Sequence, residues 1–258
     1  KMKTNLPDIY ALGDAAVTTN YVSGKKTIIP LASPANKQAR IVADIICGKN
    51  CAYQGTQGTA IARVFNLSVA STGENEASLK QNNIDYRKSY TFSNSNAGYY
   101  PDGKTMGIKL LFKTDGLILG AVIVGSKGVD KRMDVLATAI RAQMTVFDLQ
   151  ELELAYAPPF SSAKDPVNMA GYVAANILDG MTKPFYLEDI DNISADDLVL
   201  DVRTPREFQA GHLENAVNIP VDELRSRINE LDPKQKIYMY CRIGLRGYIA
   251  QRILMQKG

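Results

Sequence analysis

Two periodicities of apolar and polar positions run through the middle of the chain. Between residues 86 and 124, β-branched and aromatic runs are separated by turn residues, which is typical of strands. In other segments, apolar side chains recur every three or four residues, which predicts helices. The expected strands are 86–92, 106–112 and 117–124, with a hairpin turn at 113–116, and the expected helices are 74–81, 129–144, 148–152 and 165–178.

The N-terminal segment predicts one strand and one helix. Residues 9–12 are apolar and are expected to form a short buried strand that ends at Gly13. After a loop, a helix is expected to begin at Pro34, because proline suits a first helical turn, and to end before Gly48.

Strands and helices alternate in the last third of the chain. A linker is expected at 181–185, and Thr204 is expected to cap a helix that has Pro205 at its first position. Alternation of this kind predicts an α/β domain with a parallel sheet. The expected strands are 198–202, 216–220 and 237–240, and the other expected helices are 221–231 and 246–256.

The composition is that of a globular protein with a sizeable core. Of the 258 residues, 45% are apolar and 22% are charged. The net charge of +3 arises from mixed signs, so neither a nucleic-acid face nor a membrane patch is expected. No apolar run approaches the roughly 18 residues of a transmembrane helix, and no signal peptide is recognisable. The chain begins like the middle of a protein, so we expect a C-terminal portion of a longer enzyme.

The cysteines are too few and too scattered for a disulfide framework, which favours a reducing, cytoplasmic compartment. Cys47 and Cys51 have neither the spacing of a redox pair nor that of a zinc site. We interpret them as incidental thiols and expect no metal site. Cys241 differs, because it follows a predicted strand and precedes a predicted helix, where open α/β sheets bind ligands.

The residues after Cys241 suit a negatively charged sulfur atom. Backbone N–H groups at the start of the following helix can converge on the sulfur, and the helix dipole favours negative charge there. Gly244 lets the loop curl, while Arg242 and Arg246 add positive charge. Together these features favour a thiolate or a persulfide. The alternative is a buried structural cysteine, beside which two arginines would be unusual.

The sequence around Cys241 resembles the rhodanese domain in order, spacing and residue type. This resemblance lies in residues 201–208, 211–213, 216–220 and 241–246. It implies sulfane-sulfur transfer, in which Cys241 takes up sulfur as a persulfide and gives it to a thiol or cyanide. It also implies that four residues brace the loop and the sheet, with the histidine structural rather than a general base: Asp201, Arg203, Glu207 and His212. A complete rhodanese domain would continue beyond residue 258, so we expect a truncated one.

Residues 5–15 resemble the second flavin motif of the pyridine nucleotide-disulfide oxidoreductases. The Asp14 carboxylate, at a tight turn, can accept a hydrogen bond from a ribityl hydroxyl of FAD. The resemblance implies cofactor contacts from Gly13, Asp14 and Ala15, and from Pro34 and Ala35 on the helix that abuts the flavin ring. The alternative is an ordinary strand and turn with an aspartate cap.

Residues 58–180 resemble the dimerisation domain of the same family, through segments 97–101, 128–132 and 154–166. The branch that fits is coenzyme A-disulfide reductase with a fused rhodanese domain. In that branch, tyrosines reach across a homodimer to the partner subunit's redox cysteine and the bound thiol.

The resemblance gives the tyrosine role to Tyr156 and to Tyr99 or Tyr100, and Asn96 stands where a histidine is expected. Many disulfide reductases use a histidine of this domain as proton donor, but residues 58–180 contain none. A tyrosine hydroxyl can donate to a thiolate instead. The alternative is that these tyrosines only pack in a core or an interface, although their proline-rich surroundings favour function.

We therefore expect α/β and α+β parts in this order: a stub of an FAD-binding domain at 1–57, an α+β dimerisation domain at 58–180 and a rhodanese-like α/β domain at 186–258. The parent homodimer is expected to reduce small-molecule coenzyme A disulfides, persulfides or polysulfides with FAD and NAD(P)H, while Cys241 transfers sulfur. No Gly-x-Gly-x-x-Gly motif follows a strand, and no redox cysteine is apparent. This chain alone should therefore lack the nicotinamide site.

Two other functions stay open. The chain could be a dimeric sulfur-carrier module without reductase activity, or a relative of the flavin NADH oxidases. The rhodanese motif argues against the oxidase, because an oxygen reductase has no evident need of a sulfur carrier. The sequence leaves open the sulfur donor and acceptor, the choice between NADH and NADPH, and which of Tyr99 and Tyr100 faces the site.

Overall fold

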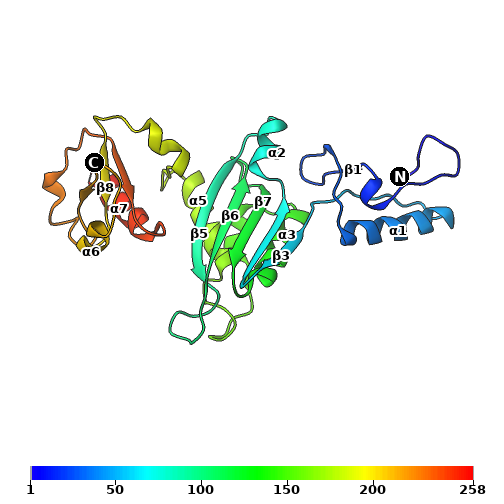
Figure 1. Cartoon of the computed structure of the whole chain (residues 1–258), viewed down its shortest axis with the longest axis horizontal. Helices are drawn as coiled ribbons and strands as arrows, with labels where there is room; N and C mark the ends of the chain where they lie inside the picture. Colours follow the sequence, from blue (N-terminus) through cyan, green and yellow to red (C-terminus); the bar gives the residue numbers. More distant parts are fainter. Residues whose placement is uncertain (1, 258) are drawn as a thin grey trace. The chain divides into compact units, whose positions relative to one another are not determined.

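The computed structural model describes residues 2–257 and divides into two compact units, Lys1–Ala175 and Asn176–Gly258 (Figure 1). The outermost positions of the predicted parts, residues 1 and 258, lie outside the described residues. The expected fold class, an α+β part followed by an α/β part with a parallel sheet, is confirmed. The exact limits of the three parts stay predictions.

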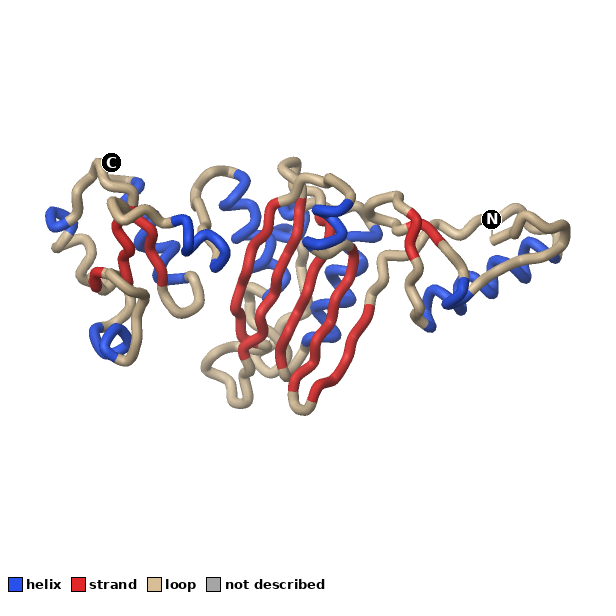
Figure 2. The backbone as a smooth tube through the Cα atoms, turned by 45° about the horizontal axis from the view of Figure 1, so that its top comes forward, coloured by secondary structure: helices blue, strands red, loops and turns tan. Residues whose placement is uncertain are grey.

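A five-stranded antiparallel sheet forms the centre of the first unit (Figure 2). The three predicted strands are confirmed with shifts of one or two residues. The predicted hairpin is closed by the Gly116 N–H, which donates to the Lys113 carbonyl at 3.0 Å. In order across the sheet, the strands are β3 (Ala60–Val64), β4 (Leu67–Gly73), β7 (Ile118–Gly125), β6 (Thr105–Phe112) and β5 (Arg87–Asn94).

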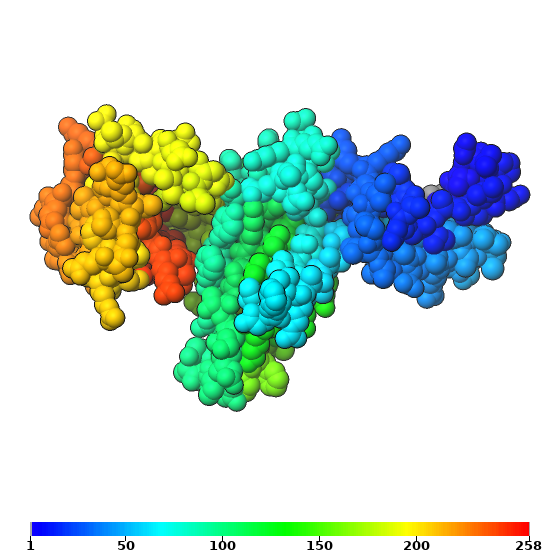
Figure 3. Space-filling view, viewed as in Figure 1, coloured from blue at the N-terminus to red at the C-terminus, as the bar shows by residue number. Residues whose placement is uncertain are grey.

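The hairpin of β3 and β4 lies at an edge of this sheet, which the apolar pattern did not locate strand by strand. It is coloured cyan on the surface shown in Figure 3. Phe65, in its turn, is 94% exposed and has a positive φ of 54°. The opposite edge is β5, which carries the loop to β6 discussed below.

Helix α3 (Val129–Arg141) packs against β4 and β7 (Figure 1). Its apolar face is buried, as the helical spacing predicted. The helix is shorter than the predicted 129–144, because Thr145 caps a separate helix, α4 (Val146–Glu151), with a capping box. The other predicted helices of this part are confirmed as α2 (Glu76–Gln81) and α5 (Pro166–Leu178).

The strand predicted at residues 9–12 is absent, so that prediction is wrong. Only Tyr10 forms an isolated bridge, with Lys3. Ile9 and Leu12 are 49% and 39% exposed. A strand needs neighbours that satisfy its backbone groups, and no other described segment supplies a ladder here. Two short strands, β1 (Thr18–Thr19) and β2 (Lys26–Thr27), pair further along.

The helix predicted from Pro34 is confirmed as α1 (Ala32–Ile46) and begins two residues earlier. Gly48 follows its end with a φ of +85°, a conformation that glycine adopts without strain. A single 3₁₀ turn, η1 (Gly13–Ala15), contacts α1. None of the helices in the described part of the chain is long and apolar enough to cross a membrane.

The second unit contains a three-stranded parallel sheet with the strand order β10-β8-β9. Its buried core includes Leu200, Val202, Ile219 and Ile253. The strands are β8 (Leu198–Asp201), β9 (Val217–Asn218) and β10 (Ile237–Tyr240), and the helices are η2 (Leu187–Asn192), α6 (Pro205–Gln209), η3 (Ile228–Glu230) and α7 (Leu245–Met255).

The helix predicted at 221–231 is wrong, because this segment forms turns and the short η3. The Ser226 hydroxyl donates to the Glu223 carbonyl at 2.8 Å, and the Ser226 N–H donates to the same oxygen at 3.0 Å. Serine side chains compete in this way with the backbone bonds of a helix. The segment still packs on the sheet, because Leu224 is fully buried.

Candidate functional site

Cys241 follows β10 directly, and its loop leads into α7 as the sequence predicted. The Sγ atom accepts hydrogen bonds from the Gly244 N–H at 3.1 Å and from the Gly247 N–H at 3.4 Å. Gly244 reaches this position with a φ of +97°, in the region that favours glycine. The two N–H groups come from the start of α7, whose dipole favours negative charge on the sulfur. The contact from Gly247 was not predicted from the sequence.

Arg246 and Arg242 occupy different surroundings in this loop. The Arg246 guanidinium donates two hydrogen bonds to the Glu207 carboxylate, at 2.7 and 2.8 Å. Those bonds raise the pKa of Arg246, with a smaller contribution from Cys241. Arg246 and the Thr204 N–H hold the pKa of the Glu207 carboxyl well below its usual range. Arg242 is exposed and has no hydrogen bond with any residue that the structure describes.

Asp201 and Arg203 form a second ion pair at the end of β8. Arg203 donates to both carboxylate oxygens at 2.6–2.9 Å and also to the Gly211 carbonyl at 2.7 Å. Burial alone would raise the pKa of the Asp201 carboxyl, but the bonds from Arg203 outweigh it and lower the pKa. This pair holds the β8 end against the turn at Gly211.

His212 lies in that same turn, and its side chain contacts Phe208. Its ring stacks on Phe208, with ring centroids 3.7 Å apart, and its Nδ1 lies 2.9 Å from the Phe208 carbonyl. This arrangement leaves His212 fixed against its own helix end. It agrees with the interpretation of His212 as a bracing residue.

Two of the three predicted tyrosines meet in the first unit. The hydroxyls of Tyr99 and Tyr156 lie 3.4 Å apart, although 57 positions separate them along the chain. Both rings are accessible, at 78% and 47% exposure. The hydrogen bond with Tyr99 raises the pKa of Tyr156. Tyr100 is also exposed, but no hydrogen bond joins its hydroxyl to the pair among the described residues.

The loops that carry these tyrosines rest on buried polar residues. Arg132, on α3, is 2% exposed and pairs with Asp165 at 2.9 Å. The side-chain amide of Asn96, which is fully buried, donates weakly to the carbonyls of Tyr100 and Pro101 at 3.4 Å. Asn96 therefore closes its own loop and does not reach the tyrosine hydroxyls. The sequence motifs predicted no role for Arg132 or Asp165.

The predicted flavin contacts lie together at η1 and the start of α1. A Cβ added at Gly13 would lie 4.0 Å from the Ala35 Cβ, so the turn approaches the helix closely. The Gly13 N–H is already taken by the buried Gln38 side chain, at 2.8 Å. The Asp14 carboxylate and Ala15 are exposed, and Asp14 has no hydrogen-bond partner among the described residues. The Asp14 carboxylate is therefore free to accept a hydrogen bond from a hydroxyl group, as predicted for FAD.

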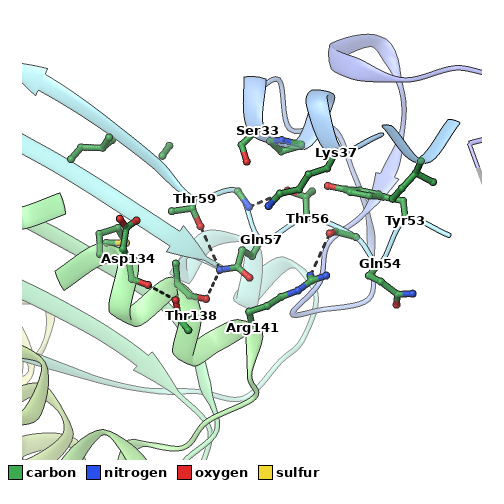
Figure 4. A pocket seen from close by; sticks show the side chains of 18 of the residues that line it. Ser33, Lys37, Tyr53, Gln54, Thr56, Gln57, Thr59, Asp134, Thr138 and Arg141 are labelled. Atoms are coloured by element: carbon green, nitrogen blue, oxygen red, sulfur yellow. Dashed lines mark hydrogen bonds between the residues drawn. The ribbon is translucent and has the colours of Figure 1, made fainter. Parts of the chain in front are cut away.

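A pocket of about 1070 Å³ lies beside this region, between α1, residues 52–61 and α3 (Figure 4). Pro34, a predicted flavin contact, is among its lining residues, and Lys37 points into it from α1. At its far side, Arg141 donates to the Gly55 carbonyl at 3.5 Å and stacks over the Tyr21 ring at 4.0 Å. The pocket thus offers cationic side chains next to the predicted flavin helix, a feature that single motifs did not reveal.

Comparisons with known proteins match both parts of the chain. Residues 59–166 match the pyridine nucleotide-disulphide oxidoreductase dimerisation domain, and residues 186–258 match the rhodanese-like domain. The coenzyme A disulfide reductase of Staphylococcus haemolyticus is 39% identical over 179 residues, which is 69% of this chain and 40% of that protein. The chain thus spans less than half the length of its curated relatives.

Two solved structures are similar over almost the whole chain. The reduced CoADR-RHD of Bacillus anthracis is 51% identical, with a TM-score of 0.94, and covers 98% of this chain and 46% of that one. The NAD-dependent persulfide reductase of A. fulgidus is 40% identical, with a TM-score of 0.90, and covers 100% of this chain and 47% of that one. A water-forming NADH oxidase from Lactobacillus brevis shares the fold at 24% identity over 69% of this chain.

The two domain matches follow each other in the order that the sequence motifs predicted. The two solved structures described above are similar to this chain over both matched regions. The chain therefore belongs to the pyridine nucleotide-disulphide oxidoreductases and combines their dimerisation domain with a rhodanese-like domain.

Proposed function

We propose that this chain is part of an FAD- and NAD(P)H-dependent reductase of coenzyme A disulfides, persulfides or polysulfides that transfers sulfur through Cys241. The observation that carries the sulfur-transfer half is the pair of backbone N–H groups on the Cys241 Sγ. The names of two relatives, a coenzyme A disulfide reductase and a persulfide reductase, support the substrate class.

The Cys241 loop is suited to nucleophilic sulfur transfer. The Cys241 thiolate attacks the outer sulfur of a donor such as thiosulfate, the S–S bond of the donor breaks, and sulfite leaves with the electron pair. Cys241 then carries a persulfide. The N–H groups of Gly244 and Gly247 stabilise the attacking thiolate, and the Arg246 guanidinium adds positive charge to the same loop. An acceptor thiolate then attacks the outer sulfur of this persulfide. The S–S bond breaks, and Cys241 leaves as a thiolate. Such a thiol must stay reduced, so we place the enzyme in the cytoplasm.

Tyr99 and Tyr156 are the groups that we propose for the reductase half. Their hydroxyls lie within reach of each other on an accessible surface, and we therefore assign the role to Tyr99 rather than Tyr100. A phenol can donate a hydrogen bond to a thiolate that leaves during disulfide cleavage, and can supply its proton. In a homodimer, the pair would act on a thiol held by the partner subunit.

The residues at η1 and α1 fit an FAD contact. Asp14 would accept a hydrogen bond from the ribityl chain, while Pro34 and Ala35 would border the flavin ring. The chemistry that FAD supplies in such enzymes is two-electron transfer from a nicotinamide cofactor to a disulfide. Within this chain, Gln38 has the supporting task of holding the turn through the Gly13 N–H.

Intact mass after incubation with thiosulfate tests the sulfur-transfer half. One added sulfur atom is expected on the wild-type chain, removable by a reductant and absent from Cys241→Ser. Cys47→Ser is the matched control, because Cys47 is the exposed thiol at the end of α1 and should not affect uptake. Wild type without added sulfur, or Cys241→Ser with it, would contradict the proposal.

The reductase half needs a separate measurement on the complete parent enzyme. The wild-type homodimer is expected to oxidise NAD(P)H with coenzyme A disulfide, and Tyr156→Phe should lower kcat. A parent enzyme that takes up sulfur at Cys241 but never oxidises NAD(P)H would instead indicate a sulfur-carrier module.

A further inference from the structure

The largest fully buried side chain in the described structure carries a charge. Arg132 is the fourth residue of α3 and is 2% exposed, as is Asp165. Removing charges from water is costly, and the cost is offset only when good geometry and further hydrogen bonds satisfy both groups. The contacts of this pair therefore indicate which parts of the fold it holds.

The Arg132 guanidinium joins segments that are distant along the chain. Its Nη2 donates to the Ser95 carbonyl and to the Ser161 hydroxyl, both at 3.0 Å. The same Nη2 donates to Asp165 at 2.9 Å, and Nε donates to that carboxylate at 3.2 Å. Arg132 thus links α3 to the end of β5 and to the segment before α5. The planar fork of arginine makes this multiple contact possible, and a lysine ammonium cannot reproduce it.

Asp165 completes the link from the other side. Its carboxylate accepts the Ser161 hydroxyl at 2.5 Å and the Val167 N–H, at the start of α5, at 3.0 Å. Burial would raise the pKa of Asp165, but the bonds from Arg132 and Ser161 outweigh it and lower the pKa. The Asp165 carboxylate is therefore held in its charged form, with hydrogen bonds from Arg132, Ser161 and Val167.

The two segments joined by this pair are those that carry the tyrosines. Ser95 precedes Tyr99 by four residues, and Ser161 follows Tyr156 by five. A direct backbone bond from the Ala97 N–H to the Pro158 carbonyl, at 3.3 Å, ties the same two loops above the pair. Both loops thus rest on the same buried ion pair. Their outer parts place the hydroxyls of Tyr99 and Tyr156 3.4 Å apart.

We propose that Arg132, Asp165 and Ser161 are positioning residues that set the separation of the Tyr99 and Tyr156 hydroxyls. This rests on the proposed role of the tyrosines in thiol chemistry and extends it to three residues that do not touch substrate. The competing explanation is that the buried pair only stabilises the domain. The two explanations differ in one expected result. Only the positioning role predicts that the titration of Tyr156 changes when the ion pair is altered in a protein that still folds.

The test uses the titration of the Tyr156 phenol, followed by NMR of ring-labelled tyrosine and assigned by its loss in Tyr156→Phe. Tyr99→Phe removes the hydroxyl contact and is expected to lower the pKa of Tyr156 towards that of an ordinary tyrosine. Arg132→Lys and Ser161→Ala are expected to lower it in the same direction, at least half as far. Ser161→Ala removes one small group and keeps the ion pair, so it decides the matter if Arg132→Lys does not fold.

Glu76→Gln is the matched control. Glu76 pairs with Lys88 and Lys109, and it begins α2, at the end of the same sheet opposite the β5–β6 loop (Figure 1). Its loss should lower the melting temperature without changing the Tyr156 titration. If Arg132→Lys and Ser161→Ala also lower only the melting temperature, the pair is merely stabilising and the proposal is overturned.

The same spectra separate this proposal from the function on which it rests. Added coenzyme A should perturb the Tyr156 resonance in the wild-type homodimer if the tyrosines face a bound thiol. A Tyr156 titration that responds to Arg132→Lys, together with no response to coenzyme A, would keep the positioning role and reject the thiol role. A response to coenzyme A with no effect of the variants would keep the thiol role and reject the positioning role.

Discussion

The Cys241 loop and the tyrosine pair are both assembled from short polar contacts, but over very different distances along the chain. The donors to the Cys241 Sγ lie three and six residues after it. Tyr99 and Tyr156 are 57 residues apart, and Arg132 and Asp165 beneath them are 33 apart. One site is a local turn into a helix, whereas the other depends on the packing of three segments.

This difference determines how each site should respond to damage. The Cys241 loop needs only the strand, the turn and the helix that contain it, so its chemistry can change while the unit stays folded. The tyrosine pair depends on a buried charge network, in which removal of one partner leaves the other without compensation. Variants of the two sites should therefore separate loss of chemistry from loss of stability.

The largest expected effect is on the tyrosine side. Asp165→Asn leaves the buried Arg132 guanidinium uncompensated and should lower the free energy of unfolding by about 3–5 kcal/mol. Urea unfolding of the first unit measures this change. Asp44→Asn removes the carboxylate of the exposed pair with Lys49 in the same unit and is the control, with no more than a marginal loss expected. Equal losses in both variants would contradict the assigned importance of the buried pair.

The same pair predicts a pH dependence. The pKa of Asp165 is lower in the folded state, so its contribution to stability is complete above the unfolded-state pKa of about 3.9. The contribution is lost as the pH falls through the folded-state pKa. The difference in unfolding free energy between wild type and Asp165→Asn should therefore shrink in strong acid. A difference that stays constant from neutral to acid pH would show that Asp165 is not charged in the fold.

The two regions also differ in what the sequence could predict. The Cys241 loop follows from a contiguous motif, and the three central strands follow from alternation over single runs. Arg132 carries no such signal, because a charged residue on an amphipathic helix is normally assigned to the solvent face. Its burial depends on Asp165, which lies on a separate segment, and nothing in one sequence pairs the two.

The wrong predictions have the same origin. Residues 9–12 have the apolar character of a strand, but strand formation depends on neighbours that the local pattern does not specify. Residues 221–231 have apolar positions at helical spacing, yet the Ser226 hydroxyl binds the Glu223 carbonyl and turns form instead. In both cases, a contact outside the periodic pattern decided the local structure.

A smaller effect is expected at the turn of the Cys241 loop. Gly244→Ala meets no atom within 4 Å, but its φ of +97° strains any other residue, at a cost of about 1–3 kcal/mol. Relief of this strain moves the Gly244 N–H away from the Cys241 Sγ, so sulfur uptake from thiosulfate should slow. Intact-mass time courses and thermal unfolding measure the two consequences.

Gly180→Ala is the matched control for that turn. Gly180 has a φ of +68°, also in open space, but lies outside the loop. It should reproduce the loss of stability without slowing sulfur uptake. If both alanine variants slow uptake equally, the Gly244 N–H is not a specific contact. Sulfur uptake would then depend on the stability of the whole unit and not on the Cys241 loop alone.

The smallest expected effect concerns a long-range contact of the Cys241 loop, the hydrogen bonds that Arg246 donates to Glu207, 39 residues away. Glu207→Gln keeps the side-chain size but weakens the charged bonds that hold the guanidinium. The rate of sulfur uptake should fall about tenfold, the size of one hydrogen bond to a charged group, while the final yield stays at one sulfur atom. Because Arg246 keeps the pKa of Glu207 well below its usual range, the deficit should persist in mildly acidic buffer.

Glu223→Gln, in an exposed pair with Arg227 of the same unit, should leave the rate unchanged. Uptake at the wild-type rate in Glu207→Gln would mean that backbone N–H groups alone sustain the site, and the loop would then be local in its chemistry as well as in its sequence.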